Sequence, residues 1–65
     1  MKFSDKVFYL RQKNKLTQVE LAEKAHVKQS TIQAYESGRA KPFYGTVVQL
    51  AAALGVSTEE LLREE

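Results

Sequence analysis

Apolar residues recur along this chain at helical spacing, and polar caps, glycines and one proline divide them into short segments. Phe3, Val7 and Leu10 stand at i, i+4 and i+7, which is the spacing of one helix face. They predict a first helix from about Ser4 to Lys13, with Ser4 as the capping residue. We expect the three apolar side chains to face the core.

The start of a second helix is predicted by a capping box in the segment TQVE, residues 17–20. The hydroxyl of Thr17 can accept from the amide of Glu20, and the carboxylate of Glu20 can accept from the amide of Thr17. Leu16 and Leu21 flank this box at the positions of a hydrophobic staple. The helix is predicted to end near residue 25.

A third helix is predicted from Lys28 or Gln29 to about Ser37, with Ile32 and Tyr35 facing inward. Only three or four residues then separate it from the second helix. Two short helices joined by so tight a turn must cross at a steep angle. The start of this third helix is unusual, because it is rich in amides, hydroxyls and an amine.

A fourth helix is predicted from about Gly45 to Leu54, and a second capping box from Ser57 to Glu60 begins a fifth, in which Leu61 and Leu62 continue the core. The chain is therefore expected to be a single all-α domain over residues 1–65, with five short helices and no strand. The inward face of the fourth helix is predicted to consist of Val47, Leu50, Ala51 and Leu54. Left-handed residues are expected to end helices at Asn14, Gly38 and Gly55.

Composition narrows the possible classes of protein. The chain has 65 residues, 43% of them apolar, with no cysteine and one histidine. Disulfides and a cysteine-based zinc site are excluded, and one histidine cannot hold a structural metal alone. No glycine-rich phosphate loop, paired acids or nucleophile with a base is present, so we expect no enzyme, metal or cofactor. No apolar run approaches the ~20 residues of a membrane span, and a cytoplasmic location is expected.

The charges are distributed unevenly. Residues 1–58 carry nine Lys or Arg against four Asp or Glu, a net charge of +5, whereas residues 59–65 carry a net charge of −3. A basic body with an acidic end suggests a face that meets an anion. Taken alone, the charge favours the plainer interpretation of a solvated surface that happens to be basic.

The segment LTQVELAEKAHVKQSTIQAYESGRAKP, residues 16–42, resembles the helix-turn-helix of the lambda-repressor-like family, also called the Cro or XRE family. The later segment LAAALGVSTEELL resembles the closing part of that family. The resemblance implies a compact five-helix DNA-binding domain whose helix-turn-helix is formed by the second and third helices. The positions that match the family pattern are Leu16, Thr17, Gln18, Leu21, Ala22, Val27, Ile32, Tyr35, Glu36, Gly38 and Pro42.

In this motif the second helix of the pair lies in the major groove, and its first residues meet the base edges. The resemblance thus offers an explanation for the polar residues at the start of the third helix, which would contact DNA bases. Expected base contacts are Lys28, Gln29, Ser30 and Gln33, and expected backbone contacts are Gln18, Thr31, Arg39 and Lys41, with Lys13 or Lys15 as further phosphate candidates. Gln18 can instead brace Gln29. The family also implies a structural salt bridge between Arg11 and Glu36.

Two positions depart from the family pattern. His26 stands where the family usually has glycine in a left-handed turn, a conformation that histidine tolerates at some cost. Lys28 replaces the serine that commonly caps the third helix, which loses a cap and adds a cation. Of Phe43 and Tyr44, one is expected to pack beneath the fourth helix and the other to be exposed, at a dimer contact or against DNA.

The function expected from this resemblance is sequence-specific binding of double-stranded DNA by a homodimeric transcription regulator, a repressor of a palindromic operator. The interface is expected in the fourth and fifth helices. The alternative is an antitoxin or adaptor that uses the same fold to hold another protein, through Phe43 and Tyr44 or through Leu61 and Leu62.

Overall fold

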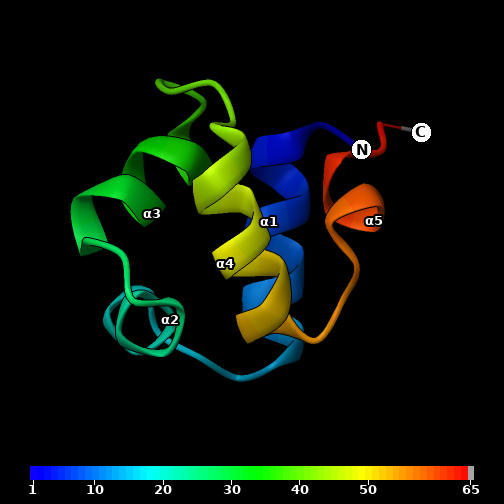
Figure 1. Cartoon of the computed structure of the whole chain (residues 1–65). Coiled ribbons are helices and arrows are strands. Elements are labelled where there is room, and N and C mark those ends of the chain that lie inside the picture. The colour runs from blue at the N-terminus through cyan, green and yellow to red at the C-terminus, as the bar shows by residue number, and fades with distance from the viewer. Residues whose placement is uncertain (65) are drawn as a thin grey trace.

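The computed structural model of the chain describes residues 1–64, and over that range it contains five α-helices and no strand (Figure 1). The all-α class and the five-helix architecture predicted from the sequence are confirmed. The helices are α1 (Phe3–Lys13), α2 (Gln18–Ala25), α3 (Gln29–Ser37), α4 (Tyr44–Leu54) and α5 (Thr58–Leu62). α2 and α3 lie on one side of α4, and α5 lies on the other side (Figure 1).

The start of α1 differs from the prediction. Lys2 is the N-cap residue, with no side-chain cap, and the helix already includes Phe3. Ser4 therefore lies within the first turn and does not cap the helix. The shift follows from burial, because Phe3 is only 7% exposed and is held in the core as part of the helix. Asp5 remains in the first turn, where a carboxylate is favoured by the helix dipole.

The end of α1 also differs from the prediction. Asn14 has φ −86° and ψ 0°, and the left-handed residue is instead its neighbour Lys15, with φ 58°. The Nδ2 of Asn14 donates to the carbonyl of Leu10 at 2.8 Å and to the carbonyl of Leu54 at 3.4 Å. Asn14 thus satisfies carbonyls at the ends of two helices, a role that does not need a positive φ.

The predicted caps of the other helices are present. Thr17 Oγ1 accepts from the amide of Glu20 at 3.0 Å, and Glu20 Oε1 accepts from the amide of Thr17 at 2.8 Å, which completes the first capping box. Ser57 Oγ accepts from the amide of Glu60 at 3.0 Å, which is the hydroxyl half of the second box. The left-handed residues that end α3 and α4 are Gly38, with φ 79°, and Gly55, with φ 74°.

One core joins all five helices. Leu61 at 0% exposure and Leu21 at 0% show that even the shortest helices contribute to it. Tyr35 packs edge-on against Phe3, with ring centroids 5.1 Å apart and planes at 80°, a favourable aromatic arrangement. The inward residues predicted for α4 are all buried. The buried apolar residues are Phe3, Val7, Leu10, Leu21, Ala22, Ala25, Ile32, Tyr35, Val47, Leu50, Ala51, Ala53, Leu54 and Leu61.

α5 is held to α1 from outside the core. Lys6 Nζ donates to the carbonyl of Glu60 at 3.1 Å and to that of Arg63 at 2.8 Å. A cation at the C-terminal end of a helix satisfies carbonyls that have no partner within the helix, and it interacts favourably with the negative end of the helix dipole. Leu62, expected to continue the core, is instead 36% exposed. In a helix of five residues only one of two adjacent side chains can face inward, and Leu61 takes that place.

Leu61 and Leu62 allow a direct test of this packing. We expect Leu61→Ala to lower the free energy of unfolding by about 2–5 kcal/mol, because it leaves a cavity in the core. Leu62→Ala should cost much less, since its side chain is partly in water. Urea denaturation, monitored by circular dichroism, measures the stability of both variants. Equal losses would show that Leu61 is not the residue of α5 that faces the core.

Candidate nucleic-acid interface

A buried ion pair joins α1 to α3. Arg11 Nε donates to Glu36 Oε2 at 2.6 Å, and Arg11 Nη2 donates to Glu36 Oε1 at 3.0 Å. Only 10% of the Arg11 side chain and 7% of the Glu36 side chain are exposed. Two parallel bonds between a guanidinium and a carboxylate fix orientation as well as distance. The pair therefore sets how α3 lies relative to α1.

The same pair also holds the start of α2. Arg11 Nη1 donates to the carbonyl of Leu16 at 2.9 Å, in the loop just before α2. Gln18, the first residue of α2, donates from Nε2 to Glu36 Oε1 at 3.0 Å. The Gln18 amide is thus braced on Glu36, and not on Gln29 as the sequence allowed. Arg11, Gln18 and Glu36, here called the anchoring cluster, tie the start of α2 and the end of α3 to α1.

The electrostatics of the anchoring cluster favour its charged form. The hydrogen bonds that Arg11 donates to Glu36 raise the pKa of Arg11 above its ordinary value; burial opposes this rise, and the charge of Glu36 adds to it. The Arg11 Cζ also lies 5.3 Å from the centroid of the Phe8 ring, within the range of a cation–π contact. Arg11 therefore stays charged wherever the domain is folded.

The turn between α2 and α3 has the left-handed geometry expected of it. His26 has φ 59° and ψ 41°, and its side chain is exposed. The amide of His26 donates to Glu23 O at 3.3 Å, and the amide of Val27 donates to Ala22 O at 3.0 Å. Ala22 is only 4% exposed, and a small side chain there lets α2 and α3 approach closely.

The polar start of α3 faces solvent. Lys28 is the N-cap residue, and its side chain forms no cap hydrogen bond, as the loss of serine predicts. Ile32 at 0% exposure and Tyr35 at 3% face the core and fix the rotation of the helix. The predicted base contacts Lys28, Gln29, Ser30 and Gln33 are all exposed, and Thr31 is half-buried beside them. These side chains therefore form one outward polar surface over the first half of α3.

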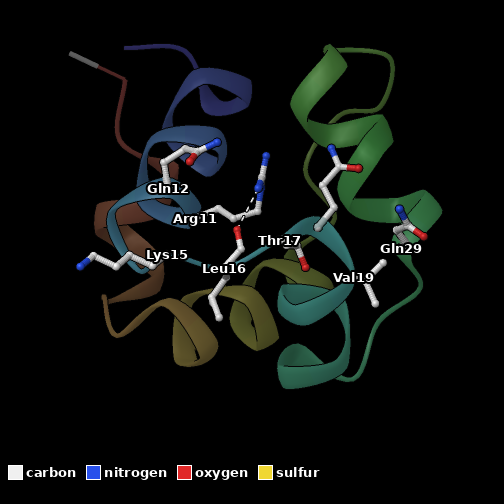
Figure 2. A pocket seen from close by; sticks show the side chains of 8 residues that line it. Arg11, Gln12, Lys15, Leu16, Thr17, Val19 and Gln29 are labelled. Atoms are coloured by element: carbon white, nitrogen blue, oxygen red, sulfur yellow. Dashed lines mark hydrogen bonds between the residues drawn. The ribbon is translucent and has the colours of Figure 1, made fainter.

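A hollow of about 620 Å³ lies at the start of α2 (Figure 2). Figure 2 shows Gln12 and Lys15 on one side of it, Val19 and Gln29 on the other, and Thr17 between them. Gln12 was not identified from the sequence, because neither apolar spacing nor a motif distinguishes it from any exposed glutamine. The hollow is lined by Arg11, Gln12, Lys15, Leu16, Thr17, Gln18, Val19 and Gln29.

The loop after α3 carries two further cations at the end of the same helix. Arg39 Nε donates to Ser37 Oγ at 3.2 Å, and Ser37 Oγ donates to Ala34 O at 3.2 Å. The amide of Arg39 donates to Ala34 O at 3.0 Å. Arg39 and Lys41 are both exposed, so this tethered loop presents two positive charges to solvent.

Phe43 and Tyr44 are both exposed, at 70% and 67%, so the prediction that one packs beneath α4 is wrong. The place beneath the loop is taken by Tyr35, whose hydroxyl accepts from the amide of Phe43 at 3.1 Å. Phe43 is the N-cap residue of α4, and its ring turns back over Gly45, where an added Cβ would lie 3.3 Å from Phe43 Cε2.

Within residues 1–64, no group of three or more His, Asp or Glu side chains is placed to hold a metal ion. Over the same residues no helix combines the length and apolar character needed to cross a membrane.

Comparison with known proteins agrees with this geometry. A family model described as helix-turn-helix matches residues 7–61. The immunity repressor of Bacillus phage phi105 is 35% identical over 65 residues, which cover all of this chain and 45% of the repressor. An uncharacterized helix-turn-helix transcriptional regulator of Bacillus subtilis is also 35% identical, over 97% of this chain and 54% of that protein. The chain thus spans about half the length of these relatives.

Among solved structures, the SinR–SinI protein complex contains a chain that superposes with a TM-score of 0.91 at 28% identity, covering 95% of this chain and 61% of that one. The restriction-modification controller protein C.AhdI from Aeromonas hydrophila superposes with a TM-score of 0.87 at 27% identity. That match covers 92% of this chain and 91% of the controller.

The anchoring cluster predicts a cost for losing Glu36. We expect Glu36→Gln to lower the free energy of unfolding by about 1–3 kcal/mol, because it leaves the Arg11 guanidinium buried without its charged partner. Glu23→Gln removes an exposed carboxylate from α2 and serves as the matched control. Thermal and urea unfolding measure the stability of both variants. If Glu36→Gln leaves the free energy of unfolding unchanged, the anchoring cluster does not contribute to stability.

Proposed function

Because this chain belongs to the lambda-repressor-like (Cro/XRE) helix-turn-helix family of DNA-binding transcription regulators, we propose that it is a sequence-specific repressor that binds a palindromic operator as a homodimer. The observation that carries the proposal is the exposed polar start of α3, held in place by the anchoring cluster. A family of this kind is a class of regulator and not of enzyme.

In the proposed complex the first half of α3 lies in the major groove. The groove presents hydrogen-bond donors and acceptors that differ for each base pair, and a glutamine can bond an adenine through two bonds. Gln29 and Lys28, at the very start of α3, are assigned as the principal base contacts, with Ser30 and Gln33 beside them. All four are exposed, so no internal bond must break for them to reach a base.

We assign contacts with DNA backbone phosphates to the two ends of the polar surface of α3. At one end, Gln18 and the hollow at the start of α2 combine the positive end of a helix dipole with the nearby Lys15. At the other end, Arg39 and Lys41 project from the tethered loop, and Thr31 lies between the two ends. Phosphate contacts of this kind fix the register of the protein on the duplex without reading sequence.

The homodimer is argued from the size of the recognition surface. One α3 presents only a few polar side chains and can read only a few base pairs. Two copies related by a two-fold axis, with half-sites about one helical turn of DNA apart, double the sequence that is read. The net charge of +5 over residues 1–58 supports association with a polyanion.

Selection of duplexes from a random pool at moderate salt, followed by sequencing, tests this proposal. We expect enrichment of a palindrome with half-sites about one turn apart. If only salt-sensitive background binding is found, the alternative of a protein-interaction module is favoured. The exposed Phe43 and Tyr44 are the observation that supports that alternative.

The two kinds of DNA contact should respond differently to mutation. On the selected site we expect Gln29→Ala to weaken binding by about 1–3 kcal/mol, with little effect on random DNA, because a base contact is lost. Lys41→Ala should weaken both equally and reduce the salt dependence, because a phosphate contact is lost. Affinities on both DNAs at several salt concentrations measure this, and identical profiles for the two variants would refute the assignment of Gln29.

Lys28→Ser separates folding from binding at one position. A serine at the N-cap of α3 can accept from a free amide, so we expect the domain to gain about 1 kcal/mol of stability. The same change removes a cation from the base-reading end of α3, so binding to the selected site should weaken. Stability and affinity measured on one preparation should therefore move in opposite directions. A variant that gains both would place Lys28 outside the interface.

A further inference from the structure

α4 differs from the other helices in its lack of charge. Its sequence, YGTVVQLAAAL, contains no Lys, Arg, Asp or Glu, whereas each of the other four helices of residues 1–64 contains at least one. A helix that is apolar nearly all round is ordinarily covered on every side. The core covers only one side of α4, so its outer face is left without a partner in the single chain.

The exposed apolar side chains form a line along α4, beside the exposed Gln49. Tyr44 is 67% exposed, Val48 is 40% exposed, and Ala52 is also exposed. They stand four residues apart, so they lie on one face of the helix and span about 12 Å. The line runs into a groove of about 280 Å³ between α4 and the end of α2, which is lined by Lys24, Ala25, His26, Gln49, Ala52 and Ala53. We call Tyr44, Val48 and Ala52 the outer stripe of α4.

We propose that the outer stripe of α4 is the contact between two copies of this chain, packed antiparallel across a two-fold axis at Val48. This assignment rests on the proposed homodimer and identifies the surface that forms it. In an antiparallel pair centred on Val48, each Tyr44 lies opposite Ala52 of the second copy. The large side chain meets a small one beside a groove, so the stripe is complementary to itself, as an isologous contact requires.

Charge favours a second copy over other occupants. Residues 1–58 carry a net charge of +5, so two copies repel over most of their surface. The outer stripe of α4 is where they can approach with no charge of either helix facing the other. A strongly basic partner would find no acidic side chain on the outer stripe or in the lining of the groove, and an acidic partner would find one lysine, Lys24, at the edge of the groove.

The same axis suits DNA binding. A two-fold axis that relates antiparallel copies of α4 lies between them and perpendicular to the helix. α2 and α3 lie on one side of α4, and α5 lies on the other (Figure 1). A half-turn about this axis therefore leaves α3 of both copies on the same side, where one duplex can meet both.

The contact is small. A stripe about 12 Å long cannot supply the ~800 Å² per partner of a stable interface. The isolated dimer is therefore weak, and the operator completes it by holding two copies side by side at high effective concentration.

The absence of cysteine from the chain permits a clean crosslinking test. A Val48→Cys chain places two thiols at the axis, where their Cα atoms come within the ~4.4–6.8 Å that a disulfide needs. We expect rapid formation of the disulfide dimer on the selected operator, and slower formation in free protein at high concentration. Leu62→Cys, on the exposed face of α5, is the matched control. Faster crosslinking through Leu62 than through Val48 would overturn the assignment.

Charge at the axis provides a second test with a built-in rescue. Val48→Glu and Val48→Lys each place like charges opposite one another, and we expect each alone to lose affinity for the full palindrome, on the order of 100-fold. Affinity for a duplex with one half-site should not change, since α3 is untouched. Mixing the two variants pairs opposite charges and should restore binding to the palindrome. Unaltered binding by either variant alone, or no rescue on mixing, would overturn the contact.

These outcomes are separable from failure of the proposed function. If no DNA sequence is selected, the proposed repressor activity fails, and crosslinking of free Val48→Cys still decides whether the outer stripe of α4 joins two copies. If a palindrome is selected and bound as a dimer, yet Val48→Cys does not crosslink on it, the stripe is wrong and the proposed function stands.

Discussion

The carboxylate of Glu36 lies at the point where three helices meet, and the placement of the exposed polar surface of α3 depends on it. Its two oxygens accept from Arg11 of α1 and from Gln18 of α2, while Glu36 itself belongs to α3. The guanidinium of Arg11 extends the connection to the carbonyl of Leu16 before α2. These bonds together fix the orientation of α3 relative to α1 and α2.

Such a cluster is better suited to fixing geometry than to adding stability. The free-energy cost of removing two charges from water offsets most of the free energy of their attraction, so a buried ion pair adds little net stability. Losing one partner is nevertheless costly, because the other charge stays buried alone. Stability comes instead from the apolar core, in which Phe3, Tyr35 and Leu61 join helices far apart in sequence. The domain thus separates two tasks, with apolar burial holding the helices together and the cluster setting their orientation.

The sequence was sufficient for features that are local. Capping boxes at Thr17 and Ser57 and left-handed glycines after α3 and α4 involve residues a few positions apart, so their chemistry can be read directly. The failures involve distant parts of the chain. Asn14 reaches a carbonyl of α4, which removed the need for a left-handed conformation there. The side-chain amide of Gln18 bonds Glu36 and not Gln29 because of the way α3 packs beside α2. No local pattern in the sequence encodes that packing.

The most direct test of the account is a titration of isotopically labelled protein with the selected duplex, followed by backbone amide NMR. We predict that the largest changes in amide chemical shift fall at the start of α2, in the first half of α3 and in the loop that carries Arg39 and Lys41. Amides of α5, which lies on the other side of α4 from α2 and α3 (Figure 1), should change little. Changes concentrated on α1 or α5, with α3 unaffected, would contradict the claim that α3 is the surface that reads DNA.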